Sequence, residues 1–456
     1  MRRPASSPTA QHPDDGAIRC GVLIVGAGHA GLSTAYHLHA SGRLDYLVIE
    51  AEDGPGGWAR TDWTGAWGAD RAIHVLHFKD PETRALAREL LGHQVATHDR
   101  IAIIDSRGVR TPYPFHAHLH GRDPEIVREC LEGLRDAEAL RSNGAATPRT
   151  FAEWIALQQG AGVARHFMDP YNTKLWTVRP DEMWCDWMSD FIPPADNAYA
   201  KSGAERATPA KEGRNATFDY PLRGASGLPE AMAARIHPIR YQTRIASLDP
   251  DRKQATLDDG TTVRYQTLVS TMPLKSLGAM LAPLPPEEHA ACERLESVDL
   301  LLIDIGFVRR GEPAAHWVYF PDPNVLAYRL HQAHALTPSL APPGCGLYCL
   351  EVSHSRHRPL PAGDLRARAI DDLVRTGWLS SPEQVVFYRE RRRRCSYVLP
   401  LPGWSDDARL LRDYARAWDI HSIGRFGEWK YCSQEDALRD GRVAAEKLAG
   451  IGVTAR

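Results

Sequence analysis

Gly21-Val-Leu-Ile-Val-Gly26-Ala-Gly28-His-Ala-Gly31 is the stretch that decides the fold of this chain. Its apolar start predicts a buried parallel strand, and residues 32–38 continue the segment as a helix. Gly26 permits a tight turn, Gly28 lets the backbone approach a pyrophosphate, and Gly31 lets the helix pack closely on the strand. This order of strand, glycine turn and helix predicts a dinucleotide-binding unit of the Rossmann type.

A second strand supplies the acid that such a unit uses. Residues 46–50 read Tyr-Leu-Val-Ile-Glu, and Glu50 lies 19 residues after Gly31. A carboxylate at this point accepts hydrogen bonds from a ribose hydroxyl. Because NAD and FAD are both bound by this unit, it leaves the choice of dinucleotide open.

A second glycine pair follows closely and favours FAD. The segment Gly56-Gly57-Trp-Ala-Arg60-Thr resembles the flavoprotein superfamily of amine oxidases, protoporphyrinogen oxidases, carotenoid desaturases and UDP-galactopyranose mutases. The paired glycines let more backbone approach the cofactor, and Arg60 is expected to add a charge-assisted contact. Trp58 stands where these families often have a smaller or more polar residue.

The same resemblance implies that the C-terminal part of the chain completes the cofactor site. Ile-Gly424-Arg425-Phe-Gly-Glu-Trp-Lys-Tyr431 precedes a helix predicted over 434–449. Gly424 permits close backbone approach, Arg425 supplies a charge, and the N-terminus of the helix is expected to face the flavin. Two glycine turns far apart in the chain are therefore expected to bind one FAD.

The pattern around these motifs predicts an α/β protein with an α+β substrate region. The Rossmann-like FAD-binding domain is expected to be discontinuous, since a strand predicted at 267–273 returns the chain to it. The expected parts are a disordered tail (1–19), the FAD-binding domain (20–80, 216–280 and 395–450), a helical cap (81–215) with a flexible loop at 196–215, and a mixed β-sheet substrate domain (281–394). Helices are predicted at 81–91, 124–140 and 150–158, and strands at 300–307, 317–320, 346–352 and 385–388.

Three further motifs resemble UDP-galactopyranose mutase, in the same order along the chain. They are His74-Val-Leu-His77-Phe, Tyr171-Asn-Thr-Lys-Leu-Trp176 and Tyr328-Arg329. In that family the first motif lies against the flavin, the Trp of the second lines the nucleotide-sugar pocket, and the Arg of the third binds the diphosphate. Tyrosines near the C-terminus also donate hydrogen bonds to the diphosphate. The resemblance implies site roles for His77, Trp176, Arg329, Tyr397 and Tyr431. Arg206 or Arg214, on the polar loop, is the candidate for a second diphosphate arginine.

The resemblance implies a pyranose/furanose mutase that acts on a nucleoside-diphosphate sugar and uses N5 of reduced FAD as a nucleophile. The alternative is an FAD-dependent oxidoreductase of amine oxidase or desaturase type that removes hydride from a small molecule. Phe218-Asp-Tyr-Pro, followed by Gly224 and Gly227, is closer to that second pattern. A third class is a non-catalytic nucleotide-binding or partner-binding protein. The substrate, the redox partner and the oligomeric state stay open.

Composition and charge exclude several other classes. The chain has 55 basic and 57 acidic residues, so no overall field attracts nucleic acid or an anionic membrane. No apolar run reaches the roughly 18 residues of a membrane span, and residues 1–19 lack the apolar core of a secretory signal. Eight scattered cysteines without a Cys-x-x-Cys pair favour reduced thiols over a disulfide framework, as in a cytoplasmic protein.

Two clusters have both a chemical and a structural interpretation. His116, His118 and His120 alternate as on one face of a strand, which suits a metal, yet no acid or cysteine cluster stands near them. They are expected to border the substrate pocket, and no metal is predicted. The arginine-rich run 389–394 suits phosphate or nucleic acid, but the strand pattern after it favours a solvated face with one or two inward arginines.

Overall fold

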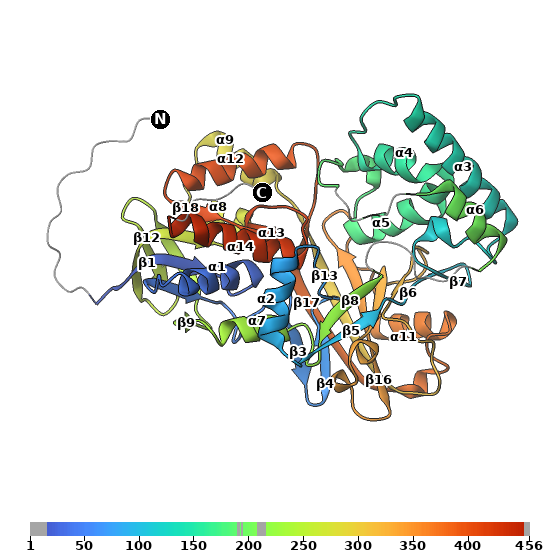
Figure 1. The fold of residues 1–456 in the computed structure, drawn as a ribbon, viewed down its shortest axis with the longest axis horizontal. Coiled ribbons are helices and arrows are strands. Elements are labelled where there is room, and N and C mark those ends of the chain that lie inside the picture. Colours follow the sequence, from blue (N-terminus) through green and yellow to red (C-terminus); the bar gives the residue numbers. More distant parts are fainter. Residues whose placement is uncertain (1–15, 189–191, 193–194, 208–215, 451–456) are drawn as a thin grey trace.

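The computed structural model describes residues 16–188, 192, 195–207 and 216–450. Figure 1 shows a sheet covered by helices at one end of the molecule, a second sheet beside it, and a group of helices (α3 to α6) above the second sheet. The first and last described segments lie together in the first part, where α1 and α14 are neighbours. The predicted α/β fold class is confirmed.

The first sheet carries the glycine motif and is mostly parallel. Its strands are β1 (Ile18–Val25), β2 (Tyr46–Ile49), β9 (Ile239–Arg240), β10 (Ile245–Asp249), β11 (Gln254–Leu257), β12 (Thr262–Ser270) and β18 (Ile420–Ser422). Their order is β10-β11-β12-β1-β2-β9, and β18 pairs with β12. β1 is parallel to β2 and β12, and β12 is parallel to β18, so three distant parts of the chain share one sheet. β1 begins at Ile18, so the last two residues of the predicted tail, 18 and 19, belong to this strand.

Helices cover both faces of this sheet because successive strand residues point to opposite sides. Val22 and Ile24 pack on one side, and Leu23 and Val25 pack on the other. The first side is covered by α1 (His29–Ala40), α2 (Pro81–Leu91), α7 (Gly227–Ala233) and α14 (Gln434–Leu448). The second is covered by α8 (Leu274–Met280), α9 (Pro286–Arg294) and α12 (Trp404–Arg416).

The second sheet is almost entirely antiparallel. Its order is β17 (Val385–Val398), β13 (Ser297–Val308), β16 (Cys345–His354), β15 (Arg329–Gln332), β14 (Trp317–Tyr319), β6 (Ala102–Ser106) and β7 (Val109–Pro112). Leu300 and Leu302 face the helical part, whereas Leu301 and Ile303 pack toward α11 (Leu365–Arg375). The four predicted strands of this region lie within β13, β14, β16 and β17, apart from Phe320 at the end of the second.

Two sequence-based boundaries differ from the observed ones. β6 and β7 lie within 81–215, which was predicted as a helical cap, and they extend the second sheet because β6 pairs with β14. β17 runs without interruption through the predicted boundary at 394/395. Two small ribbons complete the strands: β3 (Thr61–Thr64) with β4 (Trp67–Asp70), and β5 (Val95–Asp99) with β8 (Thr217–Pro221).

The helical part contains α3 (Pro124–Ser142), α4 (Phe151–Val163), α5 (Asp169–Trp176) and α6 (Asn197–Glu205), and short helices α10 (Ala333–Leu336) and α13 (Gly424–Gly427) lie elsewhere. The three predicted helices are confirmed as α2, α3 and α4. α2 and α3 begin where an aspartate caps the helix ahead of a proline, and Thr150 forms a capping box with Glu153 at the start of α4.

The structure differs from the prediction in the segment 196–215 and around the histidines at 116–120. α6 occupies part of the predicted flexible loop 196–215, because the Asp196 carboxylate accepts a hydrogen bond from the Tyr199 N–H and caps a helix. Residues 208–215 of that loop lie outside the described residues.

Phe115–Ala117 is a turn of 3₁₀ helix, so the three histidines do not share one face of a strand. The described residues contain no group of three or more potential metal ligands, and none of their helices has the length and hydropathy to cross a membrane.

Candidate active site

A cavity of about 810 Å³ opens at the carboxyl ends of β1, β2, β12 and β18. This is where open α/β sheets bind their ligands. Its walls include most of the residues predicted for the cofactor and the substrate, namely Gly26, Gly28, Glu50, Gly56, Gly57, Arg329, Tyr397, Gly424, Arg425 and Tyr431. The two glycine turns, far apart in sequence, therefore lie on one cavity.

Direct contacts hold the glycine segments together. The Gly56 N–H donates to the Ala27 carbonyl at 2.8 Å, which joins the second glycine pair to the first turn. Gly424 has a φ of +76°, and a Cβ on it would lie 2.8 Å from the Cβ of Ala30. Gly31 does not line the cavity; a Cβ there would lie 1.9 Å from the Gly26 carbonyl oxygen, so its role is the close packing of α1.

The carboxylate of Glu50 is buried and fixed at the end of β2. It accepts hydrogen bonds from the Ala27 N–H at 2.7 Å and from the Glu52 N–H at 2.9 Å. These bonds tie the first glycine turn to the acid that follows the second strand. The arrangement orients Glu50 toward the position expected for a ribose.

Several polar atoms of the cavity wall are buried without a hydrogen-bond partner in the described part of the chain. They are His29 Nε2, Ser396 Oγ, and the Nε and Nη2 of Arg425. Such orphaned groups are rare in folded proteins and point to a bound polar ligand. Gly28, the N-cap of α1, brings no side-chain cap, so the backbone N–H groups at this helix end are open to a phosphate. The residues present fit FAD.

Burial determines the charge state of His29. Desolvation, with a smaller effect of His74, lowers the pKa of His29 to about 3. Its imidazole is therefore neutral at pH 7, and its Nε2 either donates or accepts according to the tautomer. A neutral group at the N-terminus of α1 leaves the positive end of the helix as the main attraction for an anion there.

Arg425 lies among aromatic rings at the other side of the cavity. Its guanidinium carbon is 4.6 Å from the ring centre of Tyr431, 5.1 Å from that of Tyr397 and 5.8 Å from that of Phe426. Nη1 donates to the Cys432 carbonyl at 3.4 Å. The rings hold the cation in place by cation–π attraction while two of its nitrogens stay unpaired within the described residues.

Arg329 is paired, in contrast to Arg425. Its Nε and Nη2 donate to the two carboxylate oxygens of buried Glu351 at 2.9 and 2.6 Å. Burial alone would raise the pKa of Glu351, but Arg329 and His331 hold it below its usual value. The Tyr328 hydroxyl also donates to Glu351 and lies 3.1 Å from the Tyr397 hydroxyl. Arg329 Nη1 has no hydrogen bond within the described residues and is left for a ligand.

Besides Gly31, four predicted site residues of the described chain lie away from the cavity wall. The Trp176 indole is buried behind it, with its ring centre 5.7 Å from that of Tyr397 and 5.5 Å from that of Tyr431. His74, not His77, is the histidine of its motif that lines the cavity. Arg60 forms ion pairs with Glu52 and Asp53 instead of facing the cavity. Arg206 is exposed at the end of α6 and does not line the cavity, and Arg214 lies outside the described residues.

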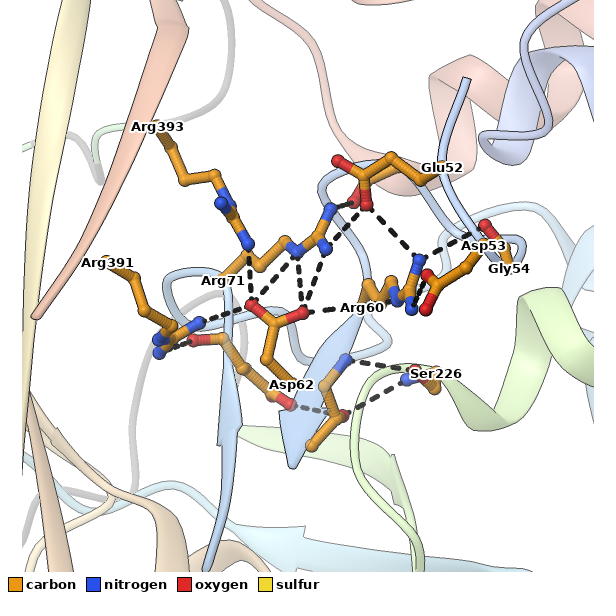
Figure 2. A network of polar contacts seen from close by, with 12 residues as sticks. Glu52, Asp53, Gly54, Arg60, Asp62, Arg71, Ser226, Arg391 and Arg393 are labelled. Atoms are coloured by element: carbon orange, nitrogen blue, oxygen red, sulfur yellow. Dashed lines mark hydrogen bonds and ion pairs between the residues drawn. The ribbon is translucent and has the colours of Figure 1, made fainter. Parts of the chain in front are cut away.

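Figure 2 shows a network of arginines and acids around Asp62. Arg71 donates through Nε and Nη2 to Asp62 and through Nη1 to the Gly57 carbonyl at 3.0 Å. Asp62 also pairs with Arg391 and Arg393 of β17, each at 2.9 Å. Burial opposes ionisation of Asp62, but these arginines hold its pKa below the usual value.

The network continues into the second sheet. Asp304 of β13 is fully buried and pairs with Arg389 at 2.8 Å and Arg391 at 2.7 Å. Three alternate arginines of the run 389–394 thus point inward, more than the one or two expected, because buried Asp304 and half-buried Asp62 receive them. The network connects the loop that carries Gly57 to strands β13 and β17 of the second sheet.

Sequence reasoning missed His29, His74, Ser396 and Glu351. His29 lies inside the glycine motif, directly after Gly28, so its position at the start of the helix was readable. Glu351 is a lone acid within an otherwise uncharged run, which signals a buried partner of opposite charge. No local pattern points to Ser396, because its role depends on the neighbouring Arg425 and Tyr431 turn.

Comparison with known proteins identifies the family of the chain. The family model described as flavin containing amine oxidoreductase matches residues 29–449. A phytoene dehydrogenase of Streptomyces griseus is 24% identical over 385 residues, which make up 72% of this chain and 71% of that protein.

Solved structures show the same fold over nearly the whole length. A reduced UDP-galactopyranose mutase superposes with a TM-score of 0.88 at 25% identity, and the match covers 95% of this chain and 96% of the other. A wild-type putrescine oxidase with bound putrescine gives a TM-score of 0.65 at 17% identity, over 95% of this chain and all of the other. The second likeness concerns the fold alone.

Proposed function

Because the chain belongs to the family of flavin-containing amine oxidoreductases, we propose that it is an FAD enzyme that interconverts the pyranose and furanose forms of a nucleoside-diphosphate sugar. One observation carries the proposal. Arg329, Tyr397 and Tyr431 come from three separate segments, and all line the cavity that both glycine turns line. The TM-score of 0.88 to a UDP-galactopyranose mutase, against 0.65 to a putrescine oxidase, supports the same choice.

FAD would be held by the glycine turns, Glu50 and the N-terminus of α1, and in its reduced form it would supply a nucleophilic nitrogen to the sugar. The residues of this chain bind and orient the substrate. Arg329 offers its open Nη1, and the Tyr397 hydroxyl lies 3.4 Å from Arg329 Nη2. These donors would hold the diphosphate close after the bond to the sugar breaks, which favours its return.

The test is an isomerisation assay on the holoenzyme. The enzyme is reduced with dithionite and incubated with a panel of nucleotide sugars, and the products are separated by chromatography and weighed by mass spectrometry. We expect one sugar to give an isomer of equal mass, and the oxidised enzyme to give none. Oxygen consumption with an amine, and no isomer from any nucleotide sugar, would overturn the proposal.

A second candidate, an oxidoreductase that removes hydride from a small molecule, has one observation in its favour. The charge of Arg329 is already balanced by Glu351, and Arg206, the residue after α6, does not line the cavity. Trp317, Tyr319 and Met280 add aromatic and apolar wall to the site. An uncharged substrate suits such a wall, and oxygen uptake or reduction of a dye in the presence of that substrate would identify this activity.

A further inference from the structure

A second cavity, of about 130 Å³, lies apart from the flavin cavity and shares no lining residue with it. Its walls come from the end of α5, the loop between β14 and β15, the end of β16, the segment after β16, and α11. It has space for a few water molecules or one small ion, and none for a nucleotide.

Three cations line this small cavity, and no acid does. Lys174 is 4% exposed, and its Nζ donates to the carbonyls of Phe320, Asp322 and Ala327 at 2.7, 2.9 and 2.7 Å. All three N–H bonds of the ammonium are therefore used, while its charge remains. Among the described residues, Arg358 and Arg368 have no ion pair.

The cations repel one another. Burial lowers the pKa of Lys174 well below its usual value, and the nearby charge of Arg358 lowers it further, while Asp322 and Asp372 act in the opposite direction without reversing the shift. Burial and Arg368 likewise lower the pKa of Arg358. Positive charge gathered in a partly buried space costs free energy unless an anion balances it.

A buried hydroxyl adds an independent sign of a missing partner. Ser353, on β16, lines the cavity and is 6% exposed, and its Oγ has no hydrogen-bond partner in the described part of the chain. The same cavity is lined by the Ser353 hydroxyl and by two guanidinium groups that form no ion pair within the described residues, and Arg358 Nη1 donates one hydrogen bond, to the Thr173 carbonyl at 3.4 Å. Together these groups make a donor set for an oxyanion.

We propose that this cavity binds a phosphate-sized oxyanion, held by Arg358, Arg368 and Ser353. Guanidinium groups match the paired oxygens of phosphate, and Lys174 adds a fixed positive charge. The site is separate from the flavin and does not depend on the proposed mutase activity. Tyr328 lines it, and the Tyr328 hydroxyl bonds to Glu351 beside Arg329, so the oxyanion would lie next to the wall of the active site.

The test is calorimetric titration of the FAD-bound enzyme with inorganic phosphate, in a chloride buffer of constant ionic strength. We expect one phosphate site, weakened about tenfold or more by Arg358→Ala or Arg368→Ala. The matched control is Arg366→Ala, which removes an exposed arginine of the same helix and should leave the affinity unchanged. In the absence of phosphate the first two variants should unfold at the wild-type temperature or above it, since each relieves repulsion.

Three outcomes would overturn the proposal. They are no phosphate binding by the wild type, equal affinity in the Arg358→Ala/Arg368→Ala double variant, and loss of binding in Arg425→Ala alone, which would place the phosphate in the flavin cavity. Crystals soaked in tungstate give a second measurement that needs no variant. Anomalous density between Arg358 and Arg368 supports the site, and density confined to the flavin cavity contradicts it.

Discussion

The two arginines of the flavin cavity differ in their partners, and this difference sets their chemistry. Arg329 forms two hydrogen bonds with buried Glu351, whereas Arg425 rests on aromatic rings with two nitrogens unpaired in the described residues. A paired arginine orients a ligand without a large net charge, and an unpaired one attracts an anion. Arg425 is thus the stronger local source of positive field in the site.

A double-mutant cycle tests the role of Arg329. Arg329→Met alone should lower the free energy of unfolding by about 3–5 kcal/mol, because it leaves Glu351 buried and unpaired. Arg329→Met with Glu351→Gln should recover most of that loss. Both variants should bind UDP at least tenfold more weakly than the wild type, if Arg329 makes a charge-assisted bond to the diphosphate.

The measurements are chemical denaturation and calorimetric titration with UDP. Glu351→Gln by itself serves as the control, since it frees the charge of Arg329 and should keep or strengthen UDP binding. Unchanged UDP affinity in the double variant would remove Arg329 from the binding site.

At the scale of single residues, the sequence predicted what backbone geometry requires. Gly26, Gly28 and Gly424 lie on the cavity as expected, because close approach of backbone to ligand has a local signature. Arg60 was expected to make a charge-assisted contact with the cofactor. It forms ion pairs with Glu52 and Asp53 instead. A local motif determines where the backbone of a residue lies, but it does not determine which partner the side chain contacts.

At the scale of elements, β17 joins the two halves of the molecule through its alternate arginines. Arg391 and Arg393 reach Asp62 of β3, which pairs with Arg71, and Arg71 holds the Gly57 carbonyl. The sequence shows the arginines as a run. It does not show the acids that receive them, because Asp62 and Asp304 lie far away in the chain.

Asp62→Asn tests whether this network positions the flavin-side loop. The variant removes the acid that Arg71, Arg391 and Arg393 share, while Arg71 keeps Glu52 and Arg391 keeps Asp304 as partners, so we expect the free energy of unfolding to fall by about 1–3 kcal/mol. The affinity for FAD should also fall, because Arg71 loses the partner that aims it at Gly57. Both quantities are measured by denaturation and by fluorescence titration of the apoprotein with FAD.

The control for that prediction is Asp53→Asn. The Asp53 side chain is 68% exposed and pairs with Arg60 at the edge of the network, so its loss should change stability by no more than about 1 kcal/mol. Equal effects of the two substitutions would show that the network has no special role in holding the loop.

At the scale of the whole molecule, the discontinuous α/β architecture could be predicted from the sequence. The boundaries between the predicted FAD-binding domain, helical cap and β-sheet domain could not. The return of β12 to the first sheet was predicted from a strand pattern at 267–273, and the return of the C-terminal part was implied by the family resemblance, although strand β18 itself was not predicted. The transfer of β6 and β7 to the second sheet depends on pairing with β14, more than 200 residues away, which no local pattern encodes. The pairing of strands far apart in the sequence therefore determines to which sheet β6 and β7 belong, which the local sequence pattern does not show.

Buried histidines from different parts of the molecule predict a loss of stability in weak acid. Burial lowers the pKa of His29 to about 3 and those of His116 and His316 to about 4. In the unfolded chain each titrates near 6.5, so below that pH the unfolded state binds protons that the folded state does not. Stability is therefore unaffected above pH 6.5 and falls as the pH drops toward 4.

The expected loss between pH 7.5 and 5.5 is about 1.4 kcal/mol for each histidine, or about 4 kcal/mol in all. Urea denaturation of the holoprotein at the two pH values measures it. His316→Asn should remove about 1.4 kcal/mol of the dependence, since the Asn oxygen can replace Nδ1 as the acceptor for the Ile101 N–H. A stability that is flat over this range would contradict the burial of these rings.

We propose that the first and last glycine turns bind a single FAD between them. FAD affinity in Gly424→Ala measures this most directly, because a Cβ at Gly424 would strain a φ of +76° and press on Ala30 of the first turn. The control is Gly260→Ala, whose φ is +85° with no atom within 4 Å of the added Cβ. We predict one FAD per wild-type chain, a clear loss of affinity in Gly424→Ala and wild-type affinity in Gly260→Ala. Equal FAD binding by all three proteins would contradict the claim.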